Sequence, residues 1–128
     1  MENKSVFQFK SYKVILSHLE IKEFSNKIGQ DINIEMGVSH KKDNKNIFIT
    51  LETTIKDNVE NLFINVKLVG LFNCENCDEI EVNNFINING PAILFPYMRA
   101  HISSLTSMAN IPTLVLPTIN FVARGSNK

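Results

Sequence analysis

Residues 32–55 read INIEMGVSHKKDNKNIFITLETTI, and this stretch decides the fold class. On both sides of the polar run 41–46, apolar residues occupy every second position, which is the repeat of a strand with one buried face. Lys, Asp and Asn in the polar run are typical of a turn. The stretch therefore predicts two strands that pair as an antiparallel hairpin.

Two further strands flank this hairpin in the sequence. Residues 62–72 place Leu62, Ile64, Val66, Leu68, Gly70 and Phe72 on one face of a strand. Residues 6–24 alternate in two phases, which indicates a long strand interrupted by a bulge. Because the connections are short and polar, we expect the four strands to form one antiparallel sheet.

The C-terminal half has a different pattern. Residues 81–89 predict a short helix closed by Gly90. A longer helix is expected to begin near Leu94, because Pro96 is tolerated only in a first turn, and to end at Asn110 and Pro112. Strands first and helices afterwards predict a single α+β domain over residues 1–128, a four-stranded antiparallel sheet with helices packed on one side.

Charge and hydropathy limit the classes of partner. The 128 residues include 13 basic and 13 acidic side chains, so the net charge is zero. Nucleic-acid binding needs clustered positive charge and is not expected. Membrane insertion is not expected either, because no apolar run approaches about 18 residues. The polar N-terminus lacks the apolar stretch of a signal peptide, and we therefore expect a cytoplasmic protein.

The charged residues are unevenly distributed. Between Val82 and Ala123, Arg99 is the only Asp, Glu, Lys or Arg. Exposed helix faces normally carry charges, so much of this segment is expected to contact a partner subunit or an apolar ligand. The alternative is a segment solvated by its Asn, Ser and Thr residues.

The sequence offers few residues for catalysis or metal binding. Cys74 and Cys77 have the spacing of half a zinc site or of a redox pair, and the alternative is two ordinary thiols. A metal-dependent oligomer would need two copies to complete such a site. His18, His40 and His101 lie apart and in no pattern with an acid and a nucleophile. We therefore assign no catalytic residue, metal ligand or cofactor, and do not expect an enzyme.

Two C-terminal motifs are specific to a family. Residues 91–107 read PAILFPYMRAHISSLTS, and residues 111–121 read IPTLVLPTINF. In these segments the chain resembles the SecB protein-export chaperones, whose pattern contains LFPYxR, a helix through Ile-Ser or Ile-Thr, a Pro-x-Leu-x-Leu segment and a closing Asn-Phe. The resemblance is fainter upstream, at residues 7–9 and 69–72.

The resemblance implies a function. SecB-like proteins are ATP-independent holdases that bind unfolded or precursor polypeptides in apolar grooves for export, and they assemble as homotetramers, dimers of dimers, through the long helix. By resemblance the groove would include Ile32, Ile34, Met36, Tyr97, Met98, Ile102 and Leu105. The alternative is that these residues form the core or a subunit interface.

The sequence departs from the family on the first and fourth strands. Members that dock on SecA carry an Asp and a Glu four residues apart on the first strand, and the matching positions here are Leu16 and Glu20. An acidic position on the fourth strand matches Asn65. Glu20 is thus the residue expected to contact SecA. A second hypothesis is a SecB-like chaperone dedicated to one partner, such as the antitoxin of a toxin–antitoxin pair.

Overall fold

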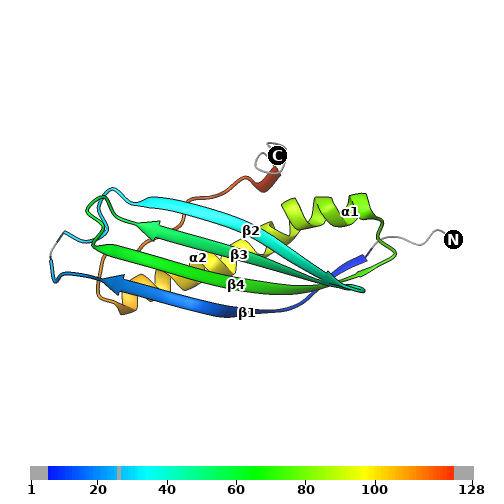
Figure 1. Cartoon of the computed structure of the whole chain (residues 1–128), viewed down its shortest axis with the longest axis horizontal. Helices are drawn as coiled ribbons and strands as arrows, with labels where there is room; N and C mark the ends of the chain where they lie inside the picture. Colours follow the sequence, from blue (N-terminus) through cyan, green and yellow to red (C-terminus); the bar gives the residue numbers. More distant parts are fainter. Residues whose placement is uncertain (1–5, 26, 123–128) are drawn as a thin grey trace.

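The computed structural model describes residues 6–25 and 27–122. Its strands form a four-stranded antiparallel sheet in the order β1-β4-β3-β2 (Figure 1). The strands are β1 (Val6–Ile21), β2 (Asn33–Asp43), β3 (Asn46–Lys56) and β4 (Leu62–Glu75). The predicted hairpin of β2 and β3 and the predicted sheet are confirmed.

β1 contains the predicted interruption. Its register with β4 shifts between Phe9 and Ser11 and again between Val14 and Leu16. Each additional residue reverses the alternation of side chains between the two faces. As a result Phe9, Val14 and Leu19 all pack against the core although their spacing breaks the period of two.

One continuous helical segment covers one face of this sheet (Figure 1). It consists of α1 (Glu79–Asn84), the π-helical turn η1 (Phe85–Asn89) and α2 (Gly90–Met108). Asp78 caps α1, because its carboxylate accepts a hydrogen bond of 2.8 Å from the backbone N–H of Glu81. No helix in the described part of the chain combines the length and apolar character needed to span a membrane.

The predicted helix boundaries were wrong at Gly90 and Leu94. Gly90 is helical (φ −60°, ψ −54°) and continues the segment. A Cβ at this position would collide with Cδ1 of Ile49. Glycine therefore permits close approach of helix and sheet. Pro96 lies inside α2 but on its exposed side, where water can bond to the carbonyl that proline leaves unpaired. The predicted end at Asn110 is confirmed by its left-handed φ of 59°.

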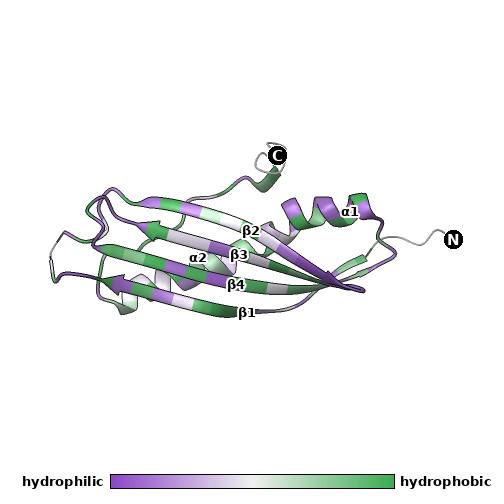
Figure 2. Ribbon diagram, in the orientation of Figure 1, coloured by the Kyte–Doolittle hydropathy of each residue, from purple (hydrophilic) through white to green (hydrophobic). Residues whose placement is uncertain are grey.

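The core lies between α2 and the central strands β3 and β4. Along β3 and β4, buried side chains alternate with half-buried ones, and the buried set faces α2. Figure 2 shows hydrophilic residues interspersed among the hydrophobic ones on these strands. This arrangement removes a continuous apolar surface from water, which is the main favourable term in folding. Its largest fully buried side chains are Phe72, Ile47, Ile49, Leu51, Ile55, Leu62, Ile64, Leu68, Leu94, Met98, Ile102 and Leu116.

The segment after α2 is held to the helix by side chains. The N–H of Leu114 donates to Oγ1 of Thr106 at 3.0 Å, and the hydroxyl of Ser103 donates to the carbonyl of Leu114 at 2.9 Å. Further along, Phe121 packs edge-on against Phe95 at 5.9 Å between ring centroids. The uncharged C-terminal segment is therefore partly core, which accounts for some of its apolar residues.

Two buried threonines provide a first prediction. Thr53 is fully buried and its hydroxyl has no hydrogen-bond partner. Such a group costs roughly 1–3 kcal/mol. We expect Thr53→Val, which keeps the shape and removes the hydroxyl, to raise the free energy of unfolding by about 1 kcal/mol, measured by denaturant titration.

Thr106→Val is the matched control. The Thr106 hydroxyl is equally buried but donates to the carbonyl of Ile102 at 3.0 Å and accepts from Leu114. The same substitution there should destabilise the protein, because it leaves partners unpaired. Equal effects of the two substitutions would contradict this account of the core.

Candidate functional site

A pocket of about 430 Å³ opens between the start of β1 and the helical segment. Phe7 and Phe9 line it from β1, Phe85 from η1 and Ile93 from α2. The rings of Phe7 and Phe85 stack with their centroids 4.1 Å apart. We refer to this site as the aromatic pocket. Its aromatic walls can take large apolar side chains, and its polar lining residues are Asn84, Asn89 and Glu81, of which only Glu81 is charged.

A pair of tyrosines continues this surface along β1. Tyr12 of β1 stacks on Tyr97 of α2, with the ring centroids 4.2 Å apart. The ring of Tyr97 also packs against that of Phe9, and these two ring centroids are 5.9 Å apart. Tyr12 and Tyr97 are 39% and 38% exposed, so each ring offers area to a ligand while fixed by the other. Beyond them, Ser17 and His101 are hydrogen-bonded at 2.8 Å.

A second hollow lies at the far end of β1. Its volume is about 320 Å³, and its apolar walls are Ile21, Phe24, Ile28, Ile111 and Pro112. Phe24 is fully exposed. We refer to this site as the distal hollow. The aromatic pocket, the tyrosine pair and the distal hollow follow one another along β1, and together we call them the apolar strip.

Two groups of the predicted groove residues lie at opposite edges of the sheet. Ile34 and Met36 lie on β2, with Ile32 just before it, and all three are half-buried against the core. Tyr97 contacts β1 instead. Because β1 and β2 are opposite edges of the sheet, one chain does not bring Tyr97 and the β2 residues into a single groove.

The remaining predicted groove residues lie under α2. Met98 and Ile102 are fully buried in the core, and Leu105 is half-buried against it. These residues do recur at helical spacing in α2, but the face that they form packs on the sheet. A ligand cannot reach Met98 or Ile102 in this conformation.

The aromatic pocket was missed by the sequence reasoning. The signal was present in Phe7 and Phe9, two aromatic residues of one phase at the start of a strand. Phe85 could not be added from the pattern, because it reaches the pocket through the π-helical turn and stacks on a residue far away in sequence.

The outer face of the sheet carries the predicted docking position. Leu16, Glu20 and Asn65 share this face, as their pairing across β1 and β4 requires. Glu20 is exposed and its carboxylate lies 3.4 Å from Nε2 of His18. The Asn65 amide donates to the Glu52 carboxylate at 2.9 Å. Of the three positions only Glu20 presents an acidic side chain.

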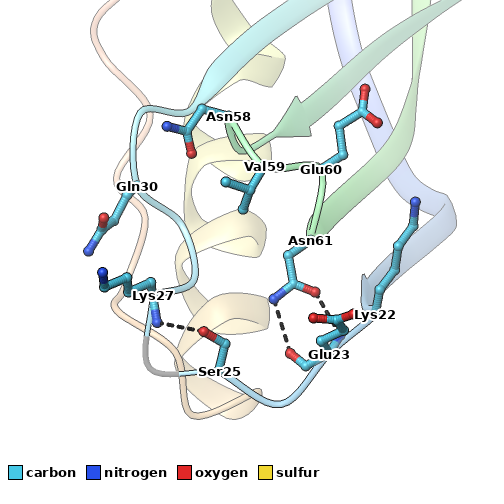
Figure 3. A pocket seen from close by; sticks show the side chains of 9 residues that line it. All are labelled: Lys22, Glu23, Ser25, Lys27, Gln30, Asn58, Val59, Glu60 and Asn61. Atoms are coloured by element: carbon cyan, nitrogen blue, oxygen red, sulfur yellow. Dashed lines mark hydrogen bonds between the residues drawn. The ribbon is translucent and has the colours of Figure 1, made fainter.

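A polar pocket of about 450 Å³ lies between the loops at the end of the sheet (Figure 3). Lys22, Glu23, Lys27 and Glu60 contribute both signs of charge. Asn61 bridges the two loops, because its amide accepts from the N–H of Glu23 at 2.7 Å and donates to the carbonyl of Glu23 at 3.0 Å. The polar pocket and the distal hollow both adjoin the segment after β1, and Ser25 lines both, but only the polar pocket is lined by side chains of both charges.

The sequence left open whether Cys74 and Cys77 are two ordinary thiols. In the structure they are not free thiols. They are joined by a disulfide, with Cα atoms 6.1 Å apart. The left-handed backbone of Asn76 (φ 57°) turns the chain between them and brings the two Cα atoms within the usual range. Among residues 6–25 and 27–122, no three His, Cys, Asp or Glu side chains gather as a metal site.

The chain is similar to known proteins in both its sequence and its fold. Residues 16–124 match the family model of the preprotein translocase subunit SecB. An uncharacterized protein of Methanocaldococcus jannaschii is 34% identical, over 97% of this chain and 85% of its own length. The protein-export protein SecB of Pseudomonas fluorescens is 33% identical, over 75% of this chain and 60% of its own length. That of Cellvibrio japonicus is also 33% identical, over 80% and 61%.

The chain thus spans about 60% of the length of these SecB relatives. A solved structure has the same fold. It is a SecB-like chaperone of Mycobacterium tuberculosis in complex with a ChAD peptide from the HigA1 antitoxin. The TM-score is 0.75 at 15% sequence identity, over 88% of this chain and 90% of that one.

Proposed function

Because the chain belongs to the SecB family, we propose that it is an ATP-independent chaperone that holds unfolded or precursor polypeptides. The family is one of chaperones and not of enzymes. The proposed setting is protein export from the cytoplasm, as the names of the SecB relatives suggest. The observation that carries the proposal is the apolar strip.

The apolar strip suits an extended polypeptide. Extended chains project alternate side chains to one side, about 7 Å apart. The aromatic pocket and the distal hollow can accept such side chains, and the tyrosine pair between them offers flat apolar area. Among the described lining residues of the two hollows, Glu81 alone is charged, which favours apolar content over a particular sequence. A folded protein buries such side chains and would not bind.

Assembly as a homotetramer is part of the proposal. The side of α2 that faces away from the sheet exposes Pro96, Ala100 and Ser104 beside a single charge, Arg99. Small uncharged residues allow a second helix to approach closely, and the lack of charge lowers the cost of burial. A dimer of dimers through α2 would also allow Ile32, Ile34 and Met36 to form a second client surface on the β2 edge.

Delivery to SecA is proposed to use the outer face of the sheet. Glu20 is the proposed contact there, since it is acidic and exposed. The outer face lies opposite the face covered by α2, so Glu20 is remote from the core residues under the helix.

Replacing Tyr97 tests the client surface. We expect Tyr97→Ser to weaken binding of a fluorescently labelled unfolded polypeptide by roughly tenfold, about 1.4 kcal/mol, because the variant loses the aromatic area shared with Tyr12. Val59→Ser is the matched control, since Val59 is also exposed but lies in the polar pocket, outside the apolar strip. Equal affinities of the two variants would mean that the client binds elsewhere.

A further inference from the structure

The Cys74–Cys77 disulfide joins the sheet to the start of the helical segment. Cys74 is the last buried residue of β4 and is only 6% exposed. Cys77 directly precedes Asp78, the N-cap of α1. The bond therefore ties α1 to the end of the sheet where β1 begins (Figure 1).

The two joined elements are also two walls of the aromatic pocket. Cys74 pairs with Phe7 across β4 and β1, and Phe7 lines the pocket. On the other side, Glu81 of α1 lines the pocket, and Phe85 follows α1 directly and stacks on Phe7. The disulfide thus constrains the turn that connects the strand wall to the helix wall.

At its C-terminal end α1 is anchored by Phe85, which stacks on Phe7, but α1 itself buries little. Val82 is its one buried residue, whereas the large apolar side chain of Ile80 is 73% exposed. The first turn depends on the capping interactions of Asp78 and on the bond from the Val82 N–H to the Asp78 carbonyl, 3.0 Å long. A short helix with one buried side chain opens readily unless it is tied down.

We propose that this disulfide is a redox clasp that controls the aromatic pocket, an inference that rests on the proposed chaperone function. Disulfides in reducing compartments are usually transient or redox-sensing. A dithiol reductant breaks the Sγ–Sγ bond, both sulfurs become thiols by gaining two electrons and two protons in total, and the reductant leaves as a cyclic disulfide. In the dithiol form α1 separates from the sheet, and the pocket loses a fixed wall and its affinity for apolar segments of a client.

The first arm of the test needs no client. Protein equilibrated with oxidised or reduced dithiothreitol is assayed for free thiols, and amide hydrogen exchange is followed at Val82, with Leu68 in the central strand β4 as reference. We expect two thiols to appear on reduction and exchange at Val82 to accelerate at least about tenfold, with Leu68 unchanged. Unchanged exchange at Val82 would overturn the clasp, whether or not clients bind.

The second arm measures affinity for a labelled unfolded polypeptide in both redox states. We expect reduction to weaken binding by about threefold or more, and Cys77→Ser to bind like the reduced protein and to ignore the reductant. Equal affinity in both states would sink the redox control while leaving the chaperone function intact. Absence of binding in either state would contradict the proposed function and, with it, control of client binding, even if Val82 still responded.

Discussion

Replacement of Ile102 by aspartate is expected to destabilise the protein severely. Ile102 is fully buried between α2 and the sheet. Among the described residues the buried polar side chains are Thr53, Asp57, Asn61 and Thr106, none of which is a cation. A carboxylate at position 102 would therefore be buried without a counter-charge, which costs roughly 4 kcal/mol or more, a large part of the stability of a typical domain. Far-ultraviolet circular dichroism and denaturant titration would measure the loss.

Ser104→Asp is the matched control on the same helix. Ser104 is exposed in the single chain, so under conditions where the protein is monomeric a carboxylate there remains hydrated and should change the free energy of unfolding by less than about 0.5 kcal/mol. If Ile102→Asp kept the wild-type denaturation midpoint, the placement of Ile102 in the core would be refuted. The position would then be open to solvent or to a ligand, as the sequence first indicated.

Replacement of Gly70 by valine is expected to cost stability although valine favours strands. Gly70 lies on the buried face of β4, beneath α2. A Cβ at this position would lie 2.5 Å from Cδ2 of Leu94, which is well inside van der Waals contact. Overpacking of this kind costs typically about 1–3 kcal/mol, more than the gain in β-propensity. A lowered denaturation midpoint at unchanged slope would report it.

Gly37→Val provides the comparison within the same sheet. Gly37 is exposed on β2, and a Cβ there would have no atom within 4 Å. Without a clash, valine should be neutral or stabilising at this position. If Gly70→Val and Gly37→Val behaved alike, close contact of α2 with the sheet would not be what requires glycine at position 70.

The sheet could be predicted from sequence because its signal is local. In β3 and β4 the buried side chains occupy every second position without interruption, so the alternation from Ile47 to Ile55 identifies both the strand and its inward face. The helix boundaries could not be predicted in this way, because they depend on contacts between residues far apart in the sequence. Whether Gly90 ends a helix or allows one to touch a strand depends on Ile49, about forty residues earlier in the sequence, and no pattern within the helix contains that contact.

The candidate site was harder to predict for a related reason. Periodicity groups Met98 and Ile102 with Tyr97 as apolar residues of one helix, but the structure buries the first two and exposes the third. Which stripe of α2 faces the sheet depends on tertiary packing. Likewise, the pocket that joins Phe7 to Phe85 exists only because the helical segment returns to the start of β1. Sequence reasoning identified the family, but of the residues that form the apolar strip it named only Tyr97.

The most direct test of the chaperone function is the affinity of the purified protein for a panel of unrelated polypeptides, each in an unfolded and a folded form, without nucleotide. We expect binding across the unfolded forms and none to their folded counterparts, because the apolar strip is the proposed contact for exposed apolar side chains. Tight binding to a single polypeptide of the panel would indicate a dedicated partner. Failure of a well-folded oligomer to bind any unfolded form would contradict the account.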